Sequence, residues 1–171
     1  MAVVDAALPA DDPVAAAHRD HYRSLVGLAC VLVDDRATCE EIVQDAFVAV
    51  FRRRDRVIDK SKLPAYLRSA VLNGARSHLR RRRVRDRARP LRVVEDATSP
   101  EHAALAGDEH RVVVEALRAL PARQRDALVL RYYLDLSERE IAETLGVSPG
   151  TVKTHIRRGL EALASTLERD R

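Results

Sequence analysis

The chain has 171 residues, of which 46% are hydrophobic, 4% are aromatic and none is Trp. Cores made of Leu, Val and Ala favour packed helices over sheets, so we expect an all-α protein: two small helical domains joined by a flexible linker. The net charge of +4 suits an anionic partner. No apolar run is long enough to cross a membrane and no signal peptide opens the chain, which excludes membrane insertion and predicts a cytoplasmic protein.

The first part of the chain predicts a short disordered N-terminus over residues 1–13, followed by two helices. The first helix covers about 14–33. The second covers about 39–54 and begins at a predicted capping box of Thr38 with Glu41. The core candidates of the first helix are Val14, Leu25, Leu28, Ala29 and Leu32.

The helix over 39–54 separates apolar from acidic residues. One face carries Ile42, Val43, Ala46, Phe47, Val50 and Phe51, and the other carries Glu41, Asp45 and Arg52, with Gln44 at the border. The pattern alone leaves two interpretations open, a solvated face and a docking face for a basic partner.

A polar loop over 55–63 precedes a third helix over 64–83, which Pro64 opens at its first position. Its inward face is predicted to hold Leu67, Ala70, Val71, Gly74, His78 and Leu79. Its outward face is predicted to hold Tyr66, Ser69, Asn73, Arg76, Ser77 and Arg80.

Positive charge is concentrated at the end of this helix. Residues 51–92 carry a net charge of +13, and residues 80–89 contain seven arginines: Arg80, Arg81, Arg82, Arg83, Arg85, Arg87 and Arg89. Cations suit a helix C-terminus, but this number exceeds what capping needs. We therefore favour a nucleic-acid surface over a merely solvated one.

Residues 84–108 lose helical periodicity and predict a linker, followed by a second domain over 109–171. This domain starts with helices over 109–120 and 121–133, the latter with Pro121 at its first position. They are expected to bury Val113, Leu117, Leu120, Leu128 and Leu130.

Residues 137–163 predict a helix-turn-helix. Ser137 and Glu140 form a capping box, Gly146 ends the first helix, and Ser148 caps the second helix, in which Pro149 takes the first position. Val152, Ile156, Leu160, Leu163 and Leu167 lie on one stripe of the second helix, while Gly150, Thr154, Arg157 and Arg158 face away from it.

Chemistry-bearing constellations do not stand out. Cys30 and Cys39 have no metal-ligand spacing and are interpreted as reduced thiols rather than a redox pair, and His78 and His155 as structural or surface residues. No phosphate-binding glycine loop, nucleophilic triad or pair of catalytic carboxylates is evident. We expect a protein that is not an enzyme and uses no cofactor or metal.

Three stretches in this order resemble the small extracytoplasmic function (ECF) group of the sigma-70 family, in a form common in actinobacteria. CEEIVQDAFVAVFRR is similar to the family's polymerase-docking helix, and LPAYLRSAVLNGARSHLRRRR to its −10 element helix. The stretch LRALPARQRDALVLRYYLDLSEREIAETLGVSPGTVKTHIRRGLEAL is similar to its −35 module. The resemblance identifies 14–83 as region 2 and 109–171 as region 4.

The resemblance implies an alternative sigma factor that binds core RNA polymerase, recognises −35 and −10 promoter elements and assists DNA opening. Its implied partners are promoter DNA, the largest-subunit coiled coil and the flap region of the polymerase, and an anti-sigma factor where one exists. The implied docking residues are Glu41, Gln44 and Asp45. The implied −10 contacts, with the loop 52–63, are Tyr66, Asn73, Arg76, Arg80, Arg81, Arg82 and Arg83. The implied −35 contacts are Ser148, Gly150, Thr151, Lys153, Thr154, Arg157 and Arg158.

Two alternatives remain open at the level of sequence. LGVSPGTVKTH also resembles the recognition helix of LuxR-type regulators, which place a sensory domain ahead of it; residues 14–83 show no alternation of strands and helices that would indicate a receiver domain. The other alternative is an interaction protein whose helix-turn-helix does not bind DNA.

Overall fold

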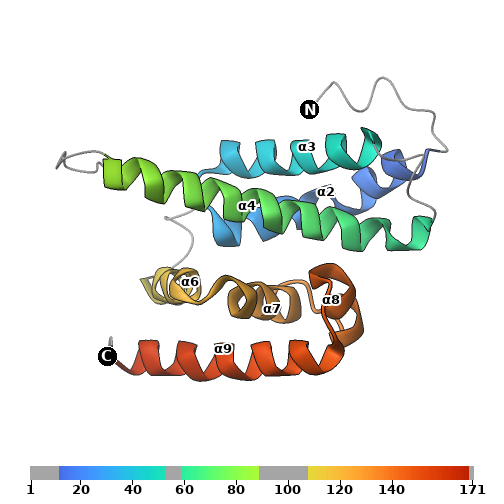
Figure 1. Ribbon diagram of the computed structural model, residues 1–171. Helices are drawn as coiled ribbons and strands as arrows, with labels where there is room; N and C mark the ends of the chain where they lie inside the picture. The colour runs from blue at the N-terminus through green and yellow to red at the C-terminus, as the bar shows by residue number, and fades with distance from the viewer. Residues whose placement is uncertain (1–11, 53–58, 89–107, 170–171) are drawn as a thin grey trace.

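Two layers of helices make up the protein in the computed structural model, which describes residues 12–52, 59–88 and 108–169 (Figure 1). The first layer contains α2 (Pro13–Leu32), α3 (Arg36–Arg52), the short 3-10 turn η2 (Lys60–Lys62) and α4 (Leu63–Ala88). The second contains α6 (Asp108–Ala119), α7 (Ala122–Tyr132), α8 (Glu138–Leu145) and α9 (Pro149–Arg169). The predicted all-α fold is confirmed. Among these helices, none is long and apolar enough to cross a membrane.

The first layer closes around a core that α2, α3 and α4 all supply. Its fully buried side chains include Leu25, Leu28, Leu32, Val43, Phe47, Leu67 and Val71. The Asp12 carboxylate accepts a hydrogen bond from the Val14 N–H at 2.7 Å and Pro13 takes the first helical position, so the start of α2 is fixed by local chemistry.

The predicted N-cap of α3, Thr38, is wrong by three residues. The helix begins at Arg36, and the Asp35 carboxylate accepts hydrogen bonds from the Thr38 N–H at 2.8 Å and from its hydroxyl at 2.5 Å. These bonds lower the pKa of Asp35. Asp35 therefore caps the helix, because its side chain reaches the third N–H, and Thr38 lies inside the first turn.

Helix α4 is longer than predicted, and its buried positions differ from the predicted ones. It continues to Ala88, through the first five residues of the predicted linker; residues 89–107 lie outside the described residues. Leu72 and Ala75 are fully buried, whereas Ala70, Gly74, His78 and Leu79, predicted to face inward, are only half-buried. Helix α4 packs against α2, α3 and α8, so its buried positions are spread over more than the single inward face that the prediction assumed.

The second layer has its core between α7, α8 and α9. Leu128, Leu130, Ile141 and Val152 are buried as the apolar periodicity requires. At Gly159 an added Cβ would lie 3.0 Å from a Leu128 methyl group, so α7 and α9 approach closely there.

Three details of the predicted second layer are wrong. Val113 and Leu160, predicted to be buried, are 38% and 40% exposed, because both lie at an open groove rather than under another helix. Pro121 stands just before α7 as its N-cap, not at the first helical position.

The predicted helix-turn-helix is confirmed. The Ser137 hydroxyl accepts a hydrogen bond from the Glu140 N–H at 3.3 Å, and the Glu140 carboxylate accepts one from the Ser137 N–H at 2.9 Å. Gly146 ends α8 in the left-handed conformation at φ 65°. The Ser148 hydroxyl then accepts a hydrogen bond from the Thr151 N–H at 3.2 Å.

Replacing Ser137 by Ala is expected to lower the free energy of unfolding by about 1 kcal/mol near neutral pH, because the cap is lost. The Ser137 hydroxyl, which donates to the Glu140 carboxylate at 2.6 Å, and the Ser137 N–H lower the pKa of Glu140. Stabilisation from a depressed carboxyl pKa is present above its unfolded value and is lost as pH falls, so the difference should shrink below about pH 4.

Urea unfolding as a function of pH measures this effect, with Ser165→Ala as the control. The Ser165 hydroxyl bonds to the Glu161 carbonyl within α9 and caps no helix. A difference that grows on acidification would contradict the role given to Glu140.

The two layers are joined by polar contacts and one close packing point. The Arg118 guanidinium donates to the Val31 carbonyl at 3.3 Å and pairs with Asp34, while Arg68 Nε donates to the Thr144 hydroxyl at 3.2 Å. Gly27 lies against the Tyr133 ring, where any side chain would collide. The two predicted domains therefore share an interface in this arrangement.

Candidate polymerase and nucleic-acid interfaces

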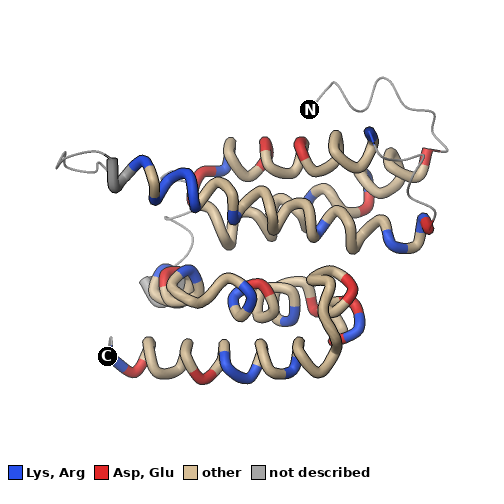
Figure 2. The backbone as a smooth tube through the Cα atoms, viewed as in Figure 1, with Lys and Arg blue, Asp and Glu red and all other residues tan. Residues whose placement is uncertain are grey.

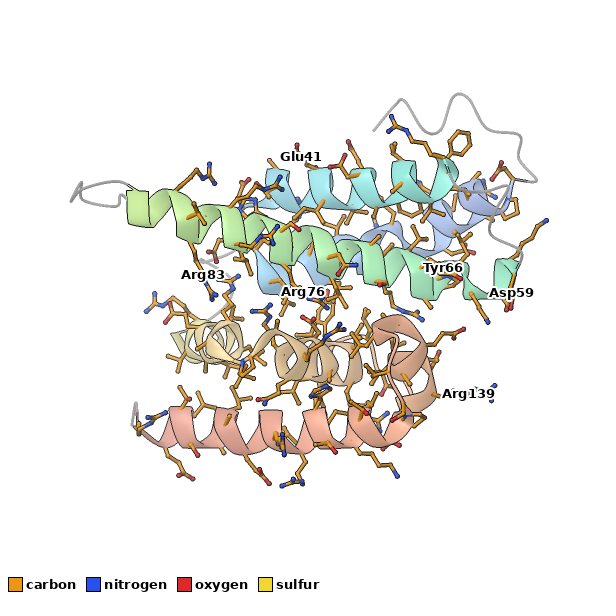
Figure 3. The ribbon with its side chains drawn as sticks, in the orientation of Figure 1. Glu41, Asp59, Tyr66, Arg76, Arg83 and Arg139 are labelled. Atoms are coloured by element: carbon orange, nitrogen blue, oxygen red, sulfur yellow. The ribbon has the colours of Figure 1, made fainter. Side chains whose placement is uncertain are left out.

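The outer face of α3 is acidic and exposed. Glu41, Gln44 and Asp45 are all exposed, while Ile42 and Val43 on the opposite side are buried. Figure 2 shows the acidic positions on the side of α3 that faces away from the second layer, and Figure 3 shows Glu41 pointing outward. The structure therefore places the three predicted docking residues together on one free surface.

The N-terminal part of α4 presents a polar surface with one aromatic ring. Tyr66 is 50% exposed and Asn73 is exposed one to two turns further along the helix. Of the predicted loop 52–63, residues 53–58 lie outside the described residues, and Arg52, Lys60 and Lys62 at its two ends are exposed. An exposed ring beside polar groups is what stacking of an unpaired base requires.

The C-terminal part of α4 carries the arginine cluster (Figure 2). Arg80, Arg81 and Arg83 are exposed, and Arg82 pairs with Asp34 at 3.2 Å. The half-buried His78 has a lowered pKa because of burial and the nearby arginines, so it does not add to this charge near neutral pH. The cluster is a track of permanent positive charge suited to phosphate groups.

Arg76 does not lie on a free surface as predicted. Its guanidinium forms two hydrogen bonds to one oxygen of Asp126 in α7, one of them from Nε at 2.8 Å, and a third to the Asn73 side chain at 3.1 Å. Asp126 is completely buried, and burial raises its pKa, against the opposing effect of Arg76. The predicted −10 residue is thus held by the second layer (Figure 3).

The start of α9 holds the seven predicted −35 residues on or near the surface. Ser148, Gly150, Lys153, Arg157 and Arg158 are exposed, and Thr151 and Thr154 are half-buried. Several already have partners: Lys153 pairs with Glu138 at 3.6 Å, Arg157 with Glu161 at 2.6 Å, and the Thr154 hydroxyl donates to the Gly150 carbonyl. Exposed ion pairs of this kind are weak and are easily exchanged for phosphate or base contacts.

The two thiols match the interpretation as reduced cysteines. Cys39 is buried, and its Sγ donates to the Val33 carbonyl at 3.6 Å; Cys30 is half-buried. Burial and the contact with Cys30 raise the pKa of Cys39. Within the described ranges, no group of three or more His, Cys, Asp or Glu side chains is placed to hold a metal ion.

Comparison with known proteins gives this arrangement a family. Residues 17–85 match the family model "Sigma-70 region 2", and residues 110–163 match "Sigma-70, region 4". The chain is 31% identical over 153 residues to the RNA polymerase sigma-E factor of Streptomyces avermitilis, covering 88% of this chain and 82% of that protein. It is 28% identical over 160 residues to the ECF RNA polymerase sigma factor SigW of Bacillus subtilis, with 86% of each covered. The chain belongs to the ECF group of the sigma-70 family.

As a member of this family, the ECF sigma factor directs promoter-specific transcription initiation with core RNA polymerase, and it is not an enzyme. Residues 17–85 match sigma region 2 where a LuxR-type regulator would carry its sensory domain. This match removes the support for the LuxR-type alternative.

Solved structures show the same fold. The protein resembles CnrH, solved in complex with the cytosolic domain of CnrY, with a TM-score of 0.69 and 22% identity over 92% of this chain and 89% of that one. It also resembles RpoE of Bartonella quintana, solved with the anti-sigma factor NepR, with a TM-score of 0.63 and 24% identity over 90% of this chain and 97% of that one.

Sequence reasoning missed the residues that join the two layers. No role was predicted for four residues that are all at least half-buried: Arg68, Arg118, Arg125 and Asp126. Three of them, Arg68, Arg118 and Asp126, form hydrogen bonds or ion pairs between the two layers. One signal was available: Asp126 is an acidic residue directly before the apolar run ALVL in a helix, where a buried carboxylate needs a cationic partner.

Proposed function

We propose that the exposed face of α3, made of Glu41, Gln44 and Asp45, docks the sigma factor on the coiled coil of the largest polymerase subunit. The support is the separation of charge on this helix: the acidic side is free, and the apolar side is buried in the core. A basic partner surface would gain encounter rate and register from such a face.

The exposed face of α4 is the proposed reader of the −10 element. Tyr66 offers a ring for stacking, Asn73 offers hydrogen bonds, and Arg80, Arg81 and Arg83 offer charge to the backbone of the separated strand. Arg76 and Arg82 join this set only when their ion pairs with Asp126 and Asp34 open.

The start of α9 is the proposed reader of the −35 element, entering the major groove with its N-terminal end first. Ser148 and Gly150 would offer backbone N–H groups to a phosphate, and Lys153 a charge. Thr151, Thr154, Arg157 and Arg158 are the candidates for base edges, of which an arginine can bind guanine through two hydrogen bonds.

An apolar groove of about 330 Å³ between α6, α7 and α9 is the proposed contact of the second layer with the polymerase flap region. Tyr132 and Tyr133 on its edge are 65% and 50% exposed, and Leu160 is 40% exposed. An anti-sigma factor, the kind of partner named with RpoE of Bartonella quintana, would compete for such a surface. Because the polymerase is cytoplasmic, we place the sigma factor there too.

These assignments rest on one observation, that three surfaces of different charge are exposed at the same time. The acidic face of α3, the arginine track of α4 and the polar start of α9 are all open on helices whose other sides are buried. A protein that bound only DNA, without a polymerase partner, would have no evident use for the acidic face of α3.

Arg157→Ala is expected to weaken −35-dependent promoter binding by about tenfold, because one arginine–guanine contact gives roughly 1–3 kcal/mol of discrimination. Folding should be unaffected, because the ion pair with Glu161 is exposed. Promoter fragments with the intact or replaced −35 element, bound by the reconstituted holoenzyme, measure the effect.

The matched control is Arg169→Ala, an exposed arginine at the far end of the same helix. The assignment fails if Arg157→Ala weakens binding equally on both fragments, or if the two variants behave alike.

A further inference from the structure

A positively lined cavity lies where the arginine end of α4 meets the turn between α6 and α7. Its volume is about 360 Å³. The polar lining comes from four arginines, Arg76, Arg80 and Arg83 of α4 and Arg125 of α7, and the apolar lining includes Leu79 and Pro121. Among the described side chains, none that lines it is acidic. Figure 3 shows Arg76 and Arg83 on the side of α4 that faces α6 and α7.

Arg125 is buried and only partly satisfied. Its side chain is 5% exposed, one terminal N–H donates to the Arg118 carbonyl at 3.4 Å, and Nε has no hydrogen-bond partner among the described residues. The nearest acid is Asp126, whose Oδ1 lies 3.8 Å from Nε, beyond hydrogen-bond length, and is itself unpartnered. A buried guanidinium with an unused N–H is costly unless an acceptor arrives.

The electrostatic surroundings of Arg125 call for an anion. Burial lowers its pKa, and Arg76, Arg83 and Arg118 lower it further by repulsion, against only Asp126 in the other direction. Asp126 directs its other oxygen to Arg76. The carboxylate therefore balances one arginine and leaves an excess of positive charge on the cavity wall.

The start of α7 adds a second source of attraction for negative charge. Pro121 is its N-cap and forms no side-chain capping bond, and Pro121 and Ala122 both line the cavity. The first N–H groups of a helix carry partial positive charge and bind phosphate in many proteins. Here a helix start without a side-chain cap and the buried Arg125, whose Nε has no hydrogen-bond partner among the described residues, line the same space.

We propose that this cavity binds the phosphate groups of a nucleotide-sized ligand, held by Arg80, Arg83, Arg125 and the start of α7. The volume falls in the range of ligand pockets, about 300–1,000 Å³. Leu79 and Pro121 give an apolar wall for the ribose or base. Guanidinium groups suit phosphate oxygens because they donate paired hydrogen bonds in a fixed plane.

Binding at this site would hold the two layers together. The cavity walls come from α4 and from the α6–α7 turn, so the ligand binds only the packed arrangement and increases its population. Arg80 and Arg83 are also proposed −10 contacts, so an occupied cavity would compete with the promoter strand. This consequence rests on the proposed function, whereas the binding itself does not.

Calorimetric titration of the full chain, without polymerase, tests the binding. The probes are inorganic pyrophosphate and a nucleoside triphosphate. The test variant is Arg80→Ala with Arg83→Ala, and the matched control is Arg81→Ala with Arg85→Ala, which removes the same charge from exposed arginines of the same helix that do not line the cavity. We expect saturable binding that is at least about tenfold weaker in the test variant and unchanged in the control.

Two outcomes would overturn the proposal. Binding that does not saturate, or that weakens equally in both variants, would mean general attraction to the arginine cluster. A short single-stranded oligonucleotide is the third probe: if it alone binds through Arg80 and Arg83, the phosphates recognised are those of nucleic acid and not of a small ligand. Promoter binding by holoenzyme reconstituted with the same variants is measured separately, so failure of ligand binding is distinguishable from failure of the promoter assignment.

Discussion

Reversing the charges of Glu41 and Asp45 to Lys is expected to weaken core polymerase binding by about 100-fold or more, with the thermal unfolding of the free protein unchanged. Two lysines would face a surface that is itself basic in the proposed complex, and like charges brought together at an interface cost several kcal/mol. Both side chains are exposed, and neither forms an ion pair within the described residues, so the fold loses no contact.

Equilibrium binding of labelled sigma factor to core enzyme measures this loss. The matched control is Glu115→Lys with Glu168→Lys, which makes the same change in net charge at exposed positions of the second layer. A double variant at Glu41 and Asp45 that binds core as tightly as the wild type would contradict the docking assignment. Equal weakening by the control would reduce it to an effect of overall charge.

Replacing Arg76 by Ala is expected to destabilise the packed arrangement of the two layers by about 3 kcal/mol. Asp126 is completely buried, and removal of its only described hydrogen-bond partner leaves its charge balanced only by Arg125, whose Nε lies 3.8 Å away. Replacing both residues by apolar ones, Arg76→Met with Asp126→Leu, should restore most of the loss. Denaturant unfolding of the single and double variants in a mutant cycle measures the coupling.

The same pair predicts a direction for pH dependence. The raised pKa of Asp126 means that the folded state binds its proton more tightly than the unfolded state, so its contribution to stability is lost as pH rises through the folded pKa. Asp126→Asn should remove this dependence. The view that the pair joins the layers would be contradicted if each single replacement, at Arg76 or at Asp126, lowered the free energy of unfolding by less than about 1 kcal/mol and the two effects were additive.

Local patterns in the sequence predicted most of the fold. The capping box of Ser137 with Glu140, the left-handed Gly146 and the Ser148 cap are formed by residues within a few positions of one another, so their geometry is determined by the nearby chain alone. The burial of Val43, Phe47 and Leu67 follows from helical periodicity in the same way.

Contacts between distant parts of the chain account for the errors. Arg76 and Asp126 are 50 positions apart, and no helical pattern indicates which of many arginines meets one aspartate. Leu72 and Ala75 are buried on a helix that packs against α2, α3 and α8, whereas helical periodicity alone predicts one buried face. The exposed faces of α3 and α9 were predictable because exposure on an amphipathic helix is local, but the pairing of Arg76 was not.

A reconstituted run-off transcription assay measures whether this one chain joins two promoter-reading surfaces to a polymerase-docking face. Purified protein and core polymerase are incubated with genomic promoter fragments, and with fragments in which the −35 or the −10 element is replaced. We expect a promoter-dependent transcript that is lost when either element is replaced and when Glu41 and Asp45 are reversed to Lys. No promoter-dependent transcript from any fragment, together with no binding to core polymerase, would contradict it.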